Sequence, residues 1–279
     1  MIIPIILYAL LGWLVGIAIN HAANTLPKHQ PVFQKPRCPE CGMVRIYLAW
    51  SSLVATLTGH QRCTACGQQH KRFIRSIIVE LITPLFFAFL LQRYSFSLHL
   101  GTISLYTSIL ILITVIDLEY RRILNIVIWP SILLAIVISF FTPLAGFWTF
   151  ASECNSLLWG IFTLVMPPPS SFWTVALMGG LTAFIISILA WLLAVLVYGH
   201  GALGQGDVTL SIFLGLILGF PYILLTFLFT VFLGSFVPFV LLVIRRIGLR
   251  SYIPYGPFLT ITGWIMLVWG DEIWRYWYC

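Results

Sequence analysis

Charged side chains are scarce in this 279-residue chain. Only 8% of its residues are charged, whereas soluble domains carry roughly 25%. With 60% hydrophobic residues and a mean hydropathy of +1.01, the composition excludes an ordinary soluble domain and predicts a membrane protein. The net charge of +7 does not indicate nucleic-acid binding, because the basic residues lie between apolar runs and form no compact basic face with interleaved aromatics. We therefore expect the lipid bilayer as a partner and no nucleic acid.

Long apolar runs make up most of the sequence. Runs of about 18–25 residues can cross a hydrocarbon core of roughly 30 Å as helices. Gly219-Phe220-Pro221 interrupts the run 208–244, which as one helix would reach about 55 Å, so two helices are expected there. The predicted fold class is an all-α polytopic membrane protein with about eight transmembrane helices and a small zinc-stapled cytoplasmic insert. The expected spans are 2–20, 76–92, 100–117, 126–145, 172–197, 208–219, 222–244 and 255–270.

The pattern divides the chain into three parts. Residues 1–27 hold the first membrane helix, 28–75 form a polar insert, and 76–279 form a multi-helix membrane domain. With the N-terminus outside, thirteen of the fifteen Lys and Arg residues fall in inner loops, as the positive-inside rule predicts. This topology makes the insert cytoplasmic and 146–171 an outer loop. It also predicts that Asp117 and Asp207 lie on the cytoplasmic side.

Two of the eight carboxylates lie at the ends of membrane-length segments. Asp117 ends one apolar run, and Asp207 begins another within Gly204-Gln205-Gly206-Asp207. A carboxylate at the bilayer boundary is costly unless it is paired or hydrated, so we expect both to be functional. Together they would share a proton and activate water, as an intramembrane aspartyl peptidase requires. Gly204 and Gly206 would keep the backbone bare for an extended substrate. The alternatives are a solvated helix end at Asp117 and a helix N-cap at Asp207.

Four of the six cysteines form two C-x-x-C motifs, Cys38-x-x-Cys41 and Cys63-x-x-Cys66, each followed by a glycine. Four thiolates spaced this way can surround Zn²⁺ as a tetrahedron, and Gly42 and Gly67 would ease the turns. Disulfides are the alternative, but a cytoplasmic insert lies in a reducing compartment. We expect a structural zinc site, because four thiolates leave no open coordination position.

Two further features of the sequence are a glutamate within a predicted span and a glycine-rich run. Glu80 lies just inside the second predicted span, where a buried glutamate needs a partner, and we consider it a candidate substrate-positioning residue. The run Gly199–Gly204 matches G-x-G-x-x-G, but it follows a membrane helix and lacks a βαβ context, so we reject dinucleotide binding. His200 within it is interpreted as a solvated loop residue.

Taken in order, these motifs resemble the type IV prepilin peptidases, a family of GxGD aspartyl proteases that are leader peptidases and N-methyltransferases. Asp117 and Asp207 correspond to its two catalytic aspartates, and the cysteine insert is similar to its zinc-binding domain. The other matching elements are Gly12-x-x-x-Gly16-x-x-x-Asn20 with Leu26-Pro27, Val79-Glu80-Leu81-Ile82-Thr83 and Ile253-Pro254-Tyr255-Gly256-Pro257.

The resemblance implies cleavage of the leader of prepilin- or pseudopilin-like substrates at the cytoplasmic face of a bacterial inner membrane. It also implies methylation of the new N-terminus by S-adenosylmethionine, for which the residues themselves offer no separate motif. Leu124-Asn125 and Thr209 depart from the family pattern, where many members have Pro-Asp and Lys. Two alternatives stay open: a preflagellin- or presenilin-type GxGD protease without methyl transfer, and a non-catalytic transporter or assembly subunit.

Overall fold

The structure is a computed structural model of the 279-residue chain. It describes residues 2–28, 37–38, 41–44, 50–60, 62–63, 65–67, 73–141, 172–198, 204–244 and 254–278. Much of the predicted insert 28–75, the predicted outer loop 146–171 and His200 lie outside the described residues. The chain forms two compact units, Met1–Val115 and Ile116–Cys279, which are considered separately.

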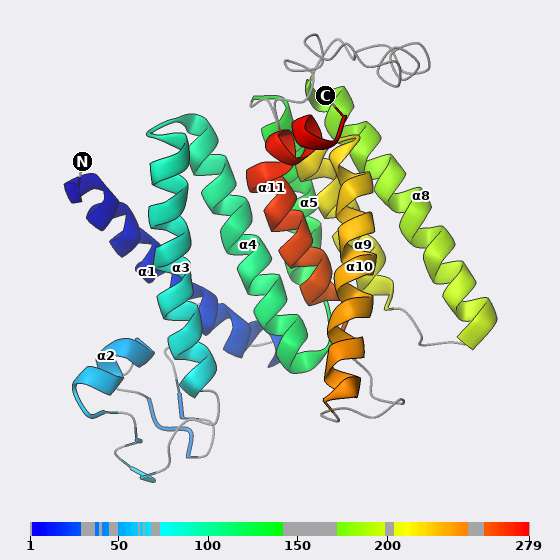
Figure 1. The fold of residues 1–279 in the computed structure, drawn as a ribbon. Coiled ribbons are helices and arrows are strands. Elements are labelled where there is room, and N and C mark those ends of the chain that lie inside the picture. The colour runs from blue at the N-terminus through cyan, green and yellow to red at the C-terminus, as the bar shows by residue number, and fades with distance from the viewer. Residues whose placement is uncertain are drawn as a thin grey trace. The chain divides into compact units, whose positions relative to one another are not determined.

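The described residues form eight helices of 14 residues or more, in the order that the apolar runs predicted (Figure 1). The bounds are α1 Ile2–Thr25, α3 Phe73–Tyr94, α4 Leu98–Tyr120, α5 Asn125–Ser139, α8 Phe172–Tyr198, α9 Gln205–Leu218, α10 Tyr222–Val243 and α11 Gly256–Tyr278. Two short elements, η1 (Leu26–Lys28) and α2 (Ser52–Leu57), fall within the insert and its entrance.

Five of these helices are long and apolar enough to cross a membrane: α1, α3, α4, α8 and α10. This confirms the membrane class but not the count of eight crossings. α5 and α9, with 15 and 14 residues, are shorter than the roughly 20 residues that a perpendicular crossing needs. α11 has 23 residues but carries Asp271, Glu272 and Arg275 near its end.

Some helix ends differ from the predictions. α5 ends at Ser139 rather than near 145, and Pro143 follows shortly in the sequence. α4 continues three residues beyond the predicted end at Asp117 and stops where Arg121 adopts a positive φ of 52°. The Arg121 N–H donates to the Asp117 carbonyl over 2.8 Å. Asp117 therefore belongs to the last helical turn.

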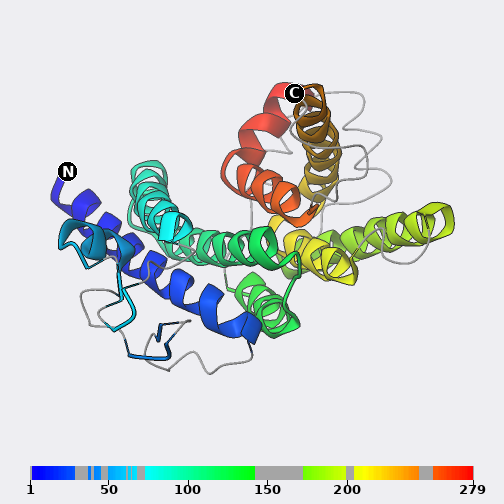
Figure 2. The same ribbon diagram turned by 90° about the horizontal axis from the view of Figure 1, so that it is seen from below.

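In the first unit, α1 and α3 cross at close range (Figures 1 and 2). A Cβ at Gly12 would lie 2.8 Å from Phe87 Cβ, and one at Gly16 would lie 3.4 Å from the Glu80 Cα. Small residues four apart allow two membrane helices to approach this closely. The predicted first-helix pattern thus serves as the contact surface for α3.

In the second unit, α9 is the buried central helix and contacts α5, α8, α10 and α11. Gly179 of α8 and Gly215 of α9 meet backbone to backbone, with no room for a Cβ at either position. The predicted break at Gly219-Phe220-Pro221 is confirmed, since Gly219 has a φ of 75° and α10 begins at Tyr222. Burial of α9 begins at Asp207, since Gly204 and Gln205 just before it are exposed.

Candidate active site and metal site

Asp117 and Asp207 both belong to the second unit. Asp117 lies three residues before the end of α4, and Asp207 is the third residue of α9. Their side chains are 4% and 8% exposed. Burial at this level argues against the alternative of a solvated carboxylate at the end of α4.

Asp207 does not cap α9, so the N-cap alternative is wrong. The N-cap is Gly204, whose backbone is extended at φ −72° and ψ 139°. The Asp207 carboxylate turns back toward this residue and accepts a hydrogen bond from the Gly204 N–H. Asp207 therefore lies in the first turn, where the positive end of the helix dipole stabilises a negative charge.

The Asp117 carboxyl lies against the first residue of α11. A Cβ at Gly256 would overlap Asp117 Oδ2 and would lie 3.1 Å from its Cγ. Asp117 Oδ2 is buried and has no hydrogen-bond partner among the described residues. A buried acceptor without a donor is rare in a native protein and is typical of a functional position.

Ile123 connects the surroundings of the two aspartates. A Cβ at Gly206 would lie 2.7 Å from Ile123 Cβ, and one at Gly256 would lie 3.6 Å from Ile123 Cδ1. Asp207 interacts electrostatically with Asp117 and with Tyr255. Three segments far apart in sequence thus meet around the two aspartates.

The chemistry of this arrangement follows from burial and like charge. Two carboxyl groups close together in a buried site cannot both ionise readily, so one of them retains a proton. A carboxylate beside a neutral carboxyl group supplies a general base and a general acid for water attack on an amide. The sequence patterns assigned no roles to Ile123, Tyr255 and Gly256, although the last two belong to the Ile253–Pro257 motif.

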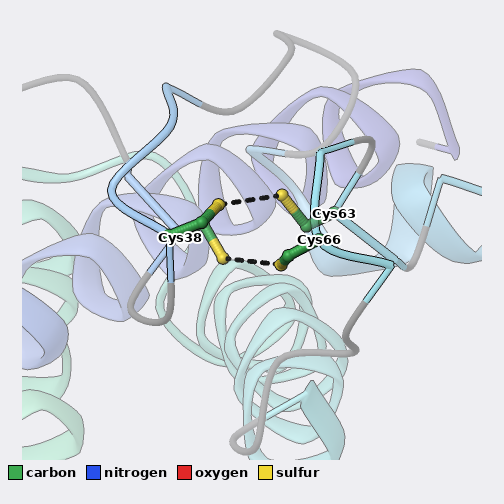
Figure 3. A group of neighbouring side chains, drawn as sticks. Cys38, Cys63 and Cys66 are labelled. Atoms are coloured by element: carbon green, nitrogen blue, oxygen red, sulfur yellow. Dashed lines mark hydrogen bonds between the residues drawn. The ribbon is translucent and has the colours of Figure 1, made fainter.

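The four cysteines of the insert converge as predicted. The Sγ atoms of Cys38, Cys41, Cys63 and Cys66 all lie within 4.8 Å of one another, with 3.8 Å between Cys38 and Cys66 and 3.6 Å between Cys41 and Cys63 (Figure 3). A tetrahedron with Zn–S bonds of about 2.3 Å requires sulfur separations of about 3.8 Å. The Cys38–Cys66 and Cys41–Cys63 separations match this value, so the tetrad is compatible with a tetrahedral metal ion.

Local backbone geometry forms both halves of this site. Gly42 and Gly67 have φ values of 73° and 68°, which confirms the role expected for the glycine after each motif. Their N–H groups donate to the carbonyls of Cys38 and Cys63 over 2.9 and 2.8 Å. The backbone amides of Cys66 and Ala65 lower the pKa of the Cys63 thiol, while the pKa of the adjacent Cys41 thiol is raised.

Glu80 lies in the first unit and is completely buried. Its carboxylate accepts hydrogen bonds from the Ser51 hydroxyl at 2.5 Å, the Ser52 and Leu53 amides at 2.9 and 3.0 Å, and the Asn20 amide at 3.3 Å. The partner that a buried glutamate needs is therefore supplied by the protein itself. The substrate-positioning role of Glu80 stays a prediction.

Together these features define a class: a multi-helix membrane protein with a buried pair of aspartates and a four-thiolate metal site. Residues 104–239, which include both aspartates, match the sequence model of the type IV leader peptidase family. Over these residues the chain is similar to this family.

Relatives extend the similarity over nearly the whole chain. A prepilin leader peptidase/N-methyltransferase of Pseudomonas aeruginosa is 27% identical over 95% of this chain and 90% of its own length. One from Pseudomonas putida is 28% identical, with coverages of 96% and 92%. One from Bacillus subtilis is 22% identical, with coverages of 94% and 93%. No solved structure matches.

Proposed function

We propose that this protein is an aspartic endopeptidase of the bacterial inner membrane. It cleaves the leader peptide of type IV prepilin- or pseudopilin-like proteins and methylates the new N-terminus. The observation that carries the proposal is the buried approach of Asp117 and Asp207, from the last turn of α4 and the first turn of α9. The cytoplasmic location of this pair follows from the positive-inside prediction.

We assign different roles to the two aspartates. Asp207 lies in the first turn of α9, at the positive end of the helix dipole, and we assign it the role of general base. Asp117 lies near the negative end of α4, and its Oδ2 has no donor among the described residues. It therefore holds the shared proton and polarises the scissile carbonyl. When water attacks, its proton passes to Asp207.

Glycines lie beside both aspartates and allow close packing around them. Gly206 and Gly256 lie against Ile123 and Asp117 without side chains of their own. The space beside these two glycines is thus filled by the protein itself. The substrate-positioning role that we propose for Gly204 and Gly206 is indirect, because their bare backbone lets Ile123 and the Asp207 carboxylate keep their places.

The metal has a structural role in this proposal. Cys38, Cys41, Cys63 and Cys66 would hold Zn²⁺ in a closed tetrahedron and so fix the fold of the insert. The methyl group would come from S-adenosylmethionine. We assign no described residues to that donor and derive no step through it.

The test uses the purified protein in lipid nanodiscs with a prepilin-like peptide and S-adenosylmethionine carrying a labelled methyl group. We expect cleavage after the leader and label on the new N-terminus. Full cleavage by both Asp117→Asn and Asp207→Asn would overturn the catalytic assignment. Cleavage without label would limit the activity to that of a leader peptidase.

A further inference from the structure

Glu80 has a hydrogen-bonding role that extends beyond α3. Each of its carboxylate oxygens accepts two hydrogen bonds: Oε1 from Ser52 N and Asn20 Nδ2, and Oε2 from Ser51 Oγ and Leu53 N. Three of these donors come from the start of α2 in the insert, and the fourth comes from α1. A single carboxylate on α3 thus holds two other segments of the first unit.

α2 needs such support because it has only six residues. A helix of this length does not form by itself in water. Ser51 is its N-cap and accepts a hydrogen bond from Val54 N over 3.3 Å. The next donors, the N–H groups of Ser52 and Leu53, bond to Glu80 instead of water. The start of α2 is therefore completed by a side chain of another helix.

The same short helix separates the two halves of the metal site. Cys41 precedes α2 and Cys63 follows it, and the sulfurs of these two residues are 3.6 Å apart. Closing the tetrad around a metal ion closes the chain segment that contains α2. Because the closed segment includes the residues that bond Glu80, restricting it by metal binding would favour their bonded arrangement.

Asn20 extends the connection to α1. Its Nδ2 donates to the Ser76 carbonyl over 2.9 Å as well as to Glu80 Oε1 over 3.3 Å. Both α1 and α3 have the length and hydropathy of membrane-spanning helices. A carboxylate shared by the insert and this helix pair links the metal site to the membrane part of the first unit.

We propose that Glu80 is the docking residue that fixes the metal-binding insert to α1 and α3, so that metal binding by the four cysteines stabilises this helix pair. This inference does not depend on the proposed peptidase activity. It gives Glu80 a positioning function within the protein that requires no contact with substrate.

The test compares wild type, Glu80→Gln and Thr83→Val, each as the full chain in lipid nanodiscs, either loaded with Zn²⁺ or treated with EDTA. Gln keeps the size of the side chain but turns an amide NH2 toward donors. Thr83 is the matched control, because it is equally buried on α3 and packs against Gly16, while its hydroxyl bonds only within the helix among the described contacts. The readouts are thermal unfolding and hydrogen exchange of the α3 backbone.

We expect EDTA to lower the unfolding midpoint of wild type and Thr83→Val by about 5 to 10 °C and to accelerate exchange in α3. In Glu80→Gln, the shift in the unfolding midpoint and the acceleration of exchange in α3 should both be less than half of the wild-type values. Metal-dependent shifts equal to those of wild type would overturn the proposal. If Glu80→Gln does not fold, Ser51→Ala removes one donor and keeps the carboxylate. Its metal response should be smaller than that of wild type, and an equal response would overturn the proposal.

Discussion

Gly256, the first residue of α11, lies so close to Asp117 that a Cβ at this position would overlap the aspartate's Oδ2. The two residues are 139 positions apart in the sequence. The position of the carboxyl group that we propose to be catalytic thus depends on the absence of a side chain on another helix.

Gly256→Ala should therefore reduce cleavage strongly. The added methyl group forces the Asp117 carboxyl away from its position, and a displacement of about 1 Å at a catalytic group can lower the rate roughly a hundredfold. The measurement is peptide cleavage in nanodiscs. Gly270→Ala is the matched control on the same helix, because its nearest atoms lie at an ordinary 3.5 Å. Equal rates in the two variants would contradict this relationship.

The two glycines of the Gly204-x-Gly206-Asp207 motif should differ in their tolerance of alanine. At Gly204 the φ of −72° suits alanine, and its Cβ would lie 3.4 Å from Asp207 Oδ2, so we expect less than a threefold loss of cleavage. At Gly206 a Cβ would lie 2.7 Å from Ile123 Cβ, and we expect at least a tenfold loss. A larger loss of cleavage for Gly204→Ala than for Gly206→Ala would show that the packing of Gly206 against Ile123 does not constrain the motif.

Isosteric replacement of either aspartate should lower cleavage by at least about a hundredfold. Asparagine resembles a protonated carboxyl group and cannot serve as a base. Because we assign the proton to Asp117, Asp117→Asn should keep more residual cleavage than Asp207→Asn. The measurement is the single-turnover cleavage rate of each variant at the same pH. A larger residual rate in Asp207→Asn would reverse the assigned roles but preserve the pair.

The purified protein should contain one zinc ion per chain. Replacing Cys38 or Cys63 by serine removes one of four thiolates, and the metal content should fall by more than half. Elemental analysis of protein purified without added chelator provides the measurement. Cys154→Ser is the control, since this cysteine lies outside both C-x-x-C motifs. An unchanged zinc content in the Cys38 and Cys63 variants would rule out the tetrad as the binding site.

Tyr222→Phe should destabilise the second unit without affecting the chemistry. The Tyr222 hydroxyl is buried and donates to the Asp271 carboxylate, joining α10 to α11. A hydrogen bond to a charged group contributes about 1.5–3 kcal/mol, so the unfolding midpoint should fall by several degrees. Cleavage at low temperature should stay near the wild-type rate. A loss of cleavage with an unchanged midpoint would assign Tyr222 a direct role instead.

Much of this architecture was predictable because its causes are local. The apolar runs predicted the order of the long helices among the described residues, and Gly219-Phe220-Pro221 predicted the break between α9 and α10. The end of α5 was predicted less well, because hydropathy continues beyond the point where helical hydrogen bonding stops. The bonding of Glu80 was not predicted, because none of its donors is a neighbour in the sequence.

By itself, the sequence determined that this is a membrane protein with two boundary aspartates and two C-x-x-C motifs whose four thiols can bind a metal. Those properties depend on hydropathy, ligand chemistry and spacing along the chain. Only the tertiary structure decided that the N-cap of α9 is Gly204 rather than Asp207, and that Gly256 lies against Asp117. It also decided that Glu80 joins α2 to α1. These contacts depend on how distant helices pack, which no local pattern of residues encodes.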